Sequence, residues 1–134
     1  MSGLSEKTRK LIVTADDLGL SHEVNQGILE AHREGIVTSA SLLVNAPETE
    51  TAVALTQECS DLEVGLHWSL VEGHSLIGRK CSLTDRRSYL GESICLHRHW
   101  KPFMLRYCFG RIRMEELAEE LELQVQRFLT FFPS

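Results

Sequence analysis

Two adjacent carboxylates, Asp16 and Asp17, end an apolar run that begins at Leu11, and Gly19 follows them closely. An apolar run bounded by a turn signal is typical of a buried strand, and the carboxyl ends of such strands carry the chemistry of α/β enzymes. Because neighbouring carboxylates repel each other, a divalent cation or a shared proton is needed to hold them together. The doublet therefore indicates a metal ligand beside a general base. The alternative is that one carboxylate caps the following helix while the other is solvated.

His67 is the second residue that could bind a metal. It lies in an alternating segment, where it shares one face with Glu63 and Gly65 and faces away from the apolar side chains expected to pack on helices, which are Val64, Leu66, Trp68 and Leu70. Neutral imidazole is the commonest metal-ligating side chain. The pattern therefore favours a ligand, and the alternative is a structural histidine within the strand.

Further polar residues follow the predicted strands. Asn45 could orient a sugar hydroxyl or an amide of a substrate, or cap the helix that opens near Pro47. His74 follows Gly73 in a predicted turn and is a second candidate for substrate contact. The pair His97 and His99 lies in a basic segment with little periodicity. We expect that pair in a solvated or substrate-facing loop.

Strands and helices alternate in the order that would position these residues. Strands are predicted at the Leu11 run, over 36–44 and over 62–70, with a helix capped by Ser21 and ended by Gly35 and another opening at Pro47. This order predicts α/β architecture with right-handed βαβ units and a parallel sheet. We expect one domain over 1–134, with a loop insertion at 71–113 and an amphipathic helix at 114–132. The predicted buried face of that helix carries Leu117, Leu121, Val125, Phe128 and Phe132.

The composition excludes several classes of protein. The chain has 134 residues, 43% hydrophobic and 25% charged, with a net charge of −5. This balance is that of an ordinary globular domain and argues against a nucleic-acid partner, which requires clustered positive charge. The N-terminal residues lack the apolar core of a signal peptide, and no apolar run reaches membrane-spanning length. We therefore expect a cytoplasmic protein with no membrane span.

Three motifs together resemble the YdjC-like carbohydrate deacetylases. The segment 14–21, followed by Asn25-Gln26-Gly27-Ile28, is similar to the opening of that family, 35–45 resembles its second strand, and Gly65-Leu66-His67 with its neighbours resembles its third. The family includes chitooligosaccharide deacetylases and the HpnK proteins, and the segments after residue 70 look most like the HpnK branch. The resemblance implies the first half of a deformed (βα) barrel with a divalent metal ion, Mg²⁺ or Zn²⁺, at its mouth.

The resemblance also implies roles for residues and a substrate. Asp17 and His67 would be metal ligands and Asp16 the catalytic base, although the roles of the two aspartates could be exchanged. The reaction implied is removal of N-acetyl groups from an acetylated carbohydrate, with Asn45 and His74 as substrate contacts. The family carries a third ligand on a strand beyond the final helix, and a barrel of this type takes about 250 residues. We expect these 134 residues to form an incomplete barrel, which a homodimer could complete. The alternatives are a relative that binds sugar or a partner without turnover, and an unrelated α/β binding domain.

Overall fold

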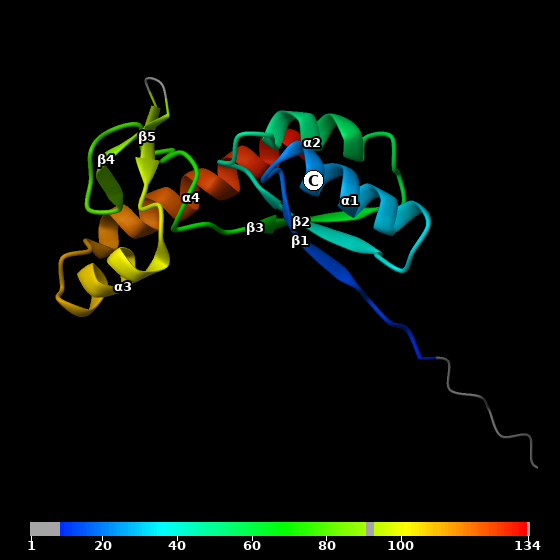
Figure 1. The fold of residues 1–134 in the computed structure, drawn as a ribbon, viewed down its shortest axis with the longest axis horizontal. Coiled ribbons are helices and arrows are strands. Elements are labelled where there is room, and N and C mark those ends of the chain that lie inside the picture. The colour runs from blue at the N-terminus through cyan, green and yellow to red at the C-terminus, as the bar shows by residue number, and fades with distance from the viewer. Residues whose placement is uncertain (1–8, 91–92, 134) are drawn as a thin grey trace, which may run out of the picture.

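A computed structural model of the chain describes residues 9–90 and 93–133 (Figure 1). Its first part is a three-stranded parallel sheet in the order β1-β2-β3, connected by two helices. We call this part the sheet unit. Its elements are β1 (Thr14–Leu18), α1 (His22–Arg33), β2 (Ser39–Leu43), α2 (Thr49–Thr56) and β3 (Glu63–His67). The predicted alternation of strands and helices and the parallel sheet are therefore confirmed, whereas the incomplete, deformed barrel stays a prediction.

The sheet unit has one apolar core beneath α1 and α2, which contact each other on the same side of the sheet. Leu18, Leu42 and Val44 are fully buried there. Ser21 caps α1, because its side-chain oxygen accepts a hydrogen bond from the Val24 N–H at 3.3 Å. The first strand begins later than predicted, at Thr14, and Leu11 and Ile12 are exposed. The apolar run predicted an earlier start, but β1 begins where its backbone pairs with β2, at Thr14 opposite Ser39.

The segment 71–113 is more ordered than the predicted loop insertion. It contains the antiparallel hairpin of β4 (Thr84–Leu90) and β5 (Ser93–Leu96), followed by α3 (Trp100–Cys108). We call this segment the hairpin unit. A separate small core, which includes Leu83, Leu96 and Phe103, lies beneath these elements. The predicted loop insertion thus contains two strands and a helix that the sequence did not indicate, because basic and aromatic residues obscure the apolar pattern of these short elements.

The last helix, α4 (Met114–Phe131), runs alongside both units (Figure 1). Its predicted apolar side chains are only partly buried: Leu117 packs on the hairpin core and Phe128 on the sheet core. The most buried residues of α4 are polar and spaced by four, namely Glu116, Glu120 and Gln124. The expectation of a purely apolar buried face was wrong.

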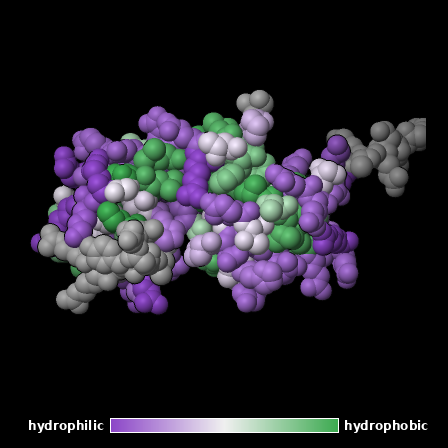
Figure 2. All heavy atoms as spheres, turned by 90° about the horizontal axis from the view of Figure 1, so that it is seen from above, coloured by the Kyte–Doolittle hydropathy of each residue, from purple (hydrophilic) through white to green (hydrophobic). Residues whose placement is uncertain are grey.

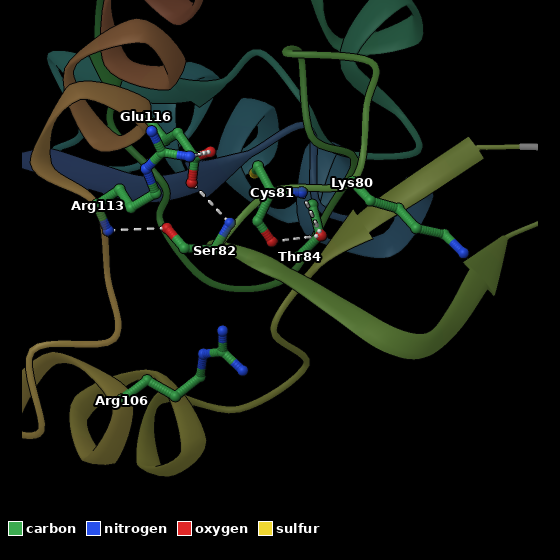
Figure 3. A pocket seen from close by; sticks show the side chains of 7 residues that line it. All are labelled: Lys80, Cys81, Ser82, Thr84, Arg106, Arg113 and Glu116. Carbon is green, nitrogen blue, oxygen red and sulfur yellow. Dashed lines mark hydrogen bonds and ion pairs between the residues drawn. The ribbon is translucent and has the colours of Figure 1, made fainter.

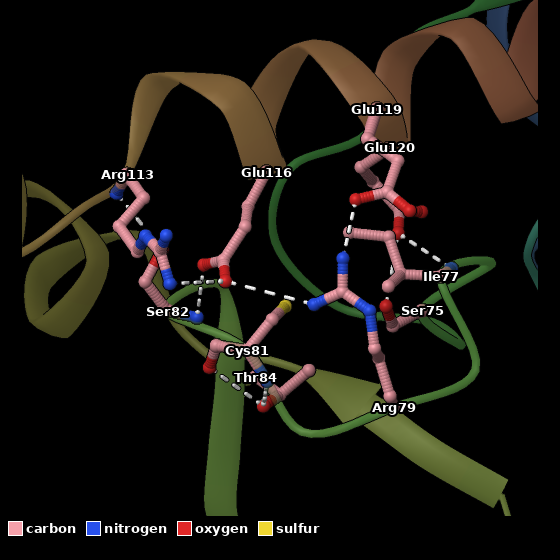
Figure 4. A network of polar contacts seen from close by, with 10 residues as sticks. All are labelled: Ser75, Ile77, Arg79, Cys81, Ser82, Thr84, Arg113, Glu116, Glu119 and Glu120. Atoms are coloured by element: carbon pink, nitrogen blue, oxygen red, sulfur yellow. Dashed lines mark hydrogen bonds and ion pairs between the residues drawn. The ribbon is translucent and has the colours of Figure 1, made fainter.

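The buried polar stripe of α4 accepts hydrogen bonds from the loop that leads into the hairpin unit. The Glu120 carboxylate accepts hydrogen bonds from the Ser75 hydroxyl at 2.9 Å and from the backbone N–H groups of Leu76 and Ile77 at 3.0 and 3.2 Å. Figure 4 shows the side chains of Ser75 and Glu120 among these contacts. Gln124 exchanges two hydrogen bonds with the backbone of Ser69. Buried backbone groups outside regular structure need such partners. The stripe therefore fixes the course of the connecting loop.

The surface seen in Figure 2 is largely hydrophilic, with hydrophobic areas over both units. The exposed large apolar side chains include Trp68, Trp100, Leu105 and Phe109. In the part of the chain that the structure describes, no helix combines the length and apolar character needed to cross a membrane.

Candidate functional site

A β-bulge in β1 brings the two adjacent carboxylates to the same side of the sheet. Ala15 pairs with Ala40 and Leu18 with Leu42, so Asp16 and Asp17 occupy a span in which β2 has one residue. In a regular strand, neighbouring side chains point to opposite faces, whereas a bulge redirects them. Asp17 adopts a left-handed backbone with φ of 67°, a conformation that aspartate tolerates better than most residues. The doublet thus owes its geometry to this irregularity.

The turn behind the carboxylates is held by buried polar contacts. The Gly19 N–H donates to Asn25 Oδ1 at 2.7 Å, and the Gly19 carbonyl accepts from the Glu48 N–H at 3.0 Å. Gly19 has φ of 96°, and a Cβ there would lie 3.0 Å from the Leu43 carbonyl oxygen. Only glycine fits this position without strain. Asn25, which is fully buried on α1, therefore anchors the end of β1 to the rest of the sheet unit.

His67, the last residue of β3, meets the doublet through Ser41 of β2. Ser41 donates its hydroxyl hydrogen to Asp16 Oδ1 at 2.7 Å, and its oxygen lies 3.0 Å from His67 Nδ1. The backbone N–H of Asp17 donates to the same His67 Nδ1 at 3.4 Å, so this nitrogen is the acceptor in that contact. Asp17 Oδ1 lies 3.6 Å from the same nitrogen. The structure therefore brings Asp16, Asp17 and His67 together at the carboxyl ends of three strands.

A cleft of about 310 Å³ opens beside Asp17 and His67. Trp68, which was expected on the buried face of β3, lines this cleft and is 59% exposed. The alternation no longer applies to it, because β3 ends at His67. Glu72 also lines the cleft with φ of 66°, so the two non-glycine residues with left-handed backbone in the described chain, Asp17 and Glu72, both border it. Such strain is concentrated at functional sites.

Asn45 lines this cleft and is hydrogen-bonded to the backbone of His74. Asn45 is 2% exposed, its Nδ2 donates to the His74 carbonyl at 3.0 Å, and its own carbonyl accepts the His74 N–H at 2.8 Å. Asn45 lines the cleft and Pro47 lies at its rim. His74 Nδ1 is buried with no hydrogen-bond partner among the described residues. Substrate contact by Asn45 and His74 stays a prediction, and their observed contacts stabilise the loop at 73–75.

Of the two later histidines, His97 differs from expectation and His99 does not. His97 is buried, with 6% exposure, and forms an isolated bridge with Val71 after β5. It was expected in a solvated loop, and the expectation was wrong because the hairpin unit has its own core. Burial, together with the nearby Arg106 cation, lowers the pKa of His97. His99 is exposed and precedes α3.

Comparison with known proteins places this geometry in a family. The model of the YdjC-like protein family matches residues 10–131. The chain belongs to the YdjC-like family. A chitooligosaccharide deacetylase from Serratia marcescens is 37% identical over 122 residues, which cover 91% of this chain and 44% of the relative. A chitooligosaccharide deacetylase from Proteus mirabilis is 43% identical with the same coverage. The chain thus spans less than half the length of these curated relatives.

A third relative and a solved structure agree with this assignment. A carbohydrate deacetylase from Brevibacillus brevis is 54% identical over 76 residues, 57% of this chain and 31% of the relative. The crystal structure of an Enterococcus faecalis V583 protein named for cellobiose-phosphate cleavage superposes with a TM-score of 0.70 at 25% identity. That match covers 90% of this chain and 43% of the other. The α/β fold of this YdjC-like chain is therefore that of a solved structure, whereas the HpnK branch stays a prediction.

The donor atoms that the YdjC-like chain assembles suit a divalent cation. Two ligands of one ion lie roughly 3 to 3.5 Å apart when each bond is about 2.1 Å, and the Asp17 carboxylate and His67 nitrogen are separated by 3.6 Å. A carboxylate with an imidazole is a donor set that zinc and related ions accept. Within the described residues, no group of three or more His, Cys, Asp or Glu side chains is close enough to hold an ion. The described chain thus offers two donors.

Sequence reasoning missed two residues of this site, Ser41 and Trp68. Ser41 alternates with the buried residues Ala40 and Leu42, so its place on the open face of β2 was visible in the pattern. The sequence pattern did not show that Ser41 bridges Asp16 and His67, because this bridge depends on the bulge in β1 and on the register of all three strands.

Proposed function

We propose that this protein is a metal-dependent hydrolase that removes N-acetyl groups from an acetylated carbohydrate. In this proposal Asp17 and His67 are metal ligands, and Asp16 is the base that accepts a proton from the attacking water. The observation that carries the proposal is the bulge at Asp16 and Asp17, which aims both carboxylates toward the face that holds His67. The names of the relatives, chitooligosaccharide and carbohydrate deacetylase, support the substrate class.

The contacts of each side chain indicate its role in the proposed reaction. A divalent cation, Mg²⁺ or Zn²⁺, would polarise the acetyl carbonyl and acidify water. Asp16 keeps one carboxylate oxygen on the Ser41 hydroxyl, which leaves its other oxygen to accept a proton. Ser41 is a positioning residue, because it links the base to the imidazole of His67. The exposed indole of Trp68 offers a flat apolar surface beside these groups on which a sugar ring can lie.

Acetate release from di-N-acetylchitobiose tests the proposal, measured for this chain in the presence of Zn²⁺ or Mg²⁺. The proposal predicts metal-dependent release that is lost in Asp16→Asn and retained in Glu63→Gln, a control that neutralises an exposed carboxylate at the opposite end of β3. Release that Asp16→Asn leaves unchanged would contradict the proposed base. Sugar binding without release would favour the alternative of a relative that binds without turnover.

A further inference from the structure

A second, larger cleft lies in a different part of the molecule, between the start of the hairpin, α3 and the first turn of α4 (Figure 3). Its volume is about 740 Å³, within the range of small-molecule sites. Its lining residues are Lys80, Cys81, Ser82, Thr84, Arg106, Arg113 and Glu116. It shares none of them with the cleft beside Asp17 and His67. The two clefts therefore have separate linings.

The lining of this cleft is electropositive although the chain as a whole is acidic. Three cationic side chains and one carboxylate border it. The segment 93–114 carries five basic residues and no aspartate or glutamate, in a chain of net charge −5. Positive charge gathered on the walls of a concave site raises the local concentration of anions.

The single carboxylate in the lining is already satisfied by neighbouring groups. Glu116 accepts the Ser82 N–H at 2.7 Å and lies 3.5 and 3.6 Å from guanidinium nitrogens of Arg113 and Arg79 (Figure 4). The hydrogen bonds from Ser82 lower the pKa of Glu116, with the two arginines contributing further. Glu116 therefore neutralises part of Arg113 and Arg79, and among the described residues no carboxylate forms an ion pair with Arg106.

Arg106 is the residue that points to a ligand. Its guanidinium extends from α3 into the cleft, and no dashed contact joins it to the other lining residues (Figure 3). Its Nε is buried and has no hydrogen-bond partner among the described residues. A buried donor on a charged group is rarely left unsatisfied, and leaving it so is costly. The guanidinium of Arg106, which extends into the cleft, carries the donors that an anion there can reach.

We propose that this cleft is an oxyanion site that binds a phosphate group, with Arg106 as its principal ligand and Arg113 as a second. The planar guanidinium fork matches phosphate oxygens with two parallel hydrogen bonds, and the guanidinium of Arg106 extends into the cleft. Free phosphate and a phosphate monoester present the same group to this fork.

Isothermal titration of the chain with inorganic phosphate tests the proposal, with chloride at matched ionic strength as the reference. We expect saturable binding that Arg106→Gln weakens roughly tenfold or more, the effect of losing a charge-assisted hydrogen bond. Arg111→Gln removes the same charge from an exposed arginine outside the cleft, and it should weaken binding far less. No saturable binding, or equal weakening by the two variants, would overturn the site.

Two further measurements make the result independent of folding and of the proposed function. Arg106→Lys keeps the charge but not the fork, and we expect it to weaken phosphate binding while retaining the near-ultraviolet circular dichroism of the parent. Binding as tight as that of the parent would overturn the role of the fork. Glycerol 3-phosphate, with glycerol as its control, separates the two sources, because tighter binding than inorganic phosphate identifies a monoester. Asp17→Asn should leave phosphate binding unchanged.

Discussion

Replacement of Glu120 by alanine should be among the most destabilising substitutions in α4. Glu120 is fully buried, and its carboxylate accepts hydrogen bonds from the Ser75 hydroxyl and the N–H groups of Leu76 and Ile77. Each buried donor left without a partner costs about 1 to 3 kcal/mol. Because water will enter part of the space that alanine leaves, we expect a total loss of about 3 to 5 kcal/mol in the free energy of unfolding.

Urea unfolding followed by circular dichroism measures this loss. Glu122→Ala is the matched control, because it makes the same change two residues away at an exposed position whose side chain accepts a hydrogen bond from Gln126. The control should change stability by about 0.5 kcal/mol or less. Glu120→Gln retains one acceptor oxygen and should fall between the two. A loss in Glu120→Ala that is no larger than in the control would refute the claim that the buried polar stripe fixes the connecting loop.

Three further predictions follow from local geometry. Gly73→Ala and Gly78→Ala both impose a side chain at φ near 70°, but only at Gly73 would the Cβ meet a backbone oxygen, that of Asn45, at 2.6 Å. In urea unfolding we expect the free energy of unfolding to fall by about 2 to 4 kcal/mol in Gly73→Ala and by about 1 kcal/mol in Gly78→Ala. Equal losses in the two variants would contradict the close packing at Gly73. The Val37 carbonyl and Asp61 raise the pKa of His32 above 6.5, so the stability that His32 contributes is complete below pH 6.5 and is lost as pH rises through the raised pKa. The difference in unfolding free energy between the parent and His32→Gln should therefore shrink at alkaline pH. A difference that grows with pH would contradict the direction of this pKa shift. Trp68→Ala should weaken binding of di-N-acetylchitobiose by roughly tenfold, measured by titration, whereas Trp100→Ala, exposed on α3, should not, and similar affinities for the two variants would exclude stacking on Trp68.

The sequence was sufficient for the parallel α/β order, because short apolar segments alternated with helical patterns bounded by Ser21 and Pro47. It also brought Asp17 and His67 to one edge of the sheet, since parallel strands end at the same edge. It predicted a metal ligand beside a general base at Asp16 and Asp17, but not the bulge that turns both side chains to one side, because adjacent strand residues normally diverge.

Burial of polar residues was the other limit of sequence interpretation. Glu120 was not expected on the buried face of α4, because acidic residues are usually exposed. The loop that crosses α4 has backbone donors in need of acceptors, and this demand arises only once the chain has folded. The hairpin unit was missed for a related reason, since its core uses few residues drawn from separate short elements.

Binding of a divalent ion is the measurement that tests the proposed site most directly. Titration of the parent chain with Zn²⁺ or Mg²⁺ should detect one ion per chain. Asp17→Asn and His67→Ala should each weaken that binding at least tenfold, an energy of about 1.4 kcal/mol, while Glu63→Gln should bind as the parent does. Equal affinity for the ion in the parent and in both site variants would show that these side chains do not hold a metal.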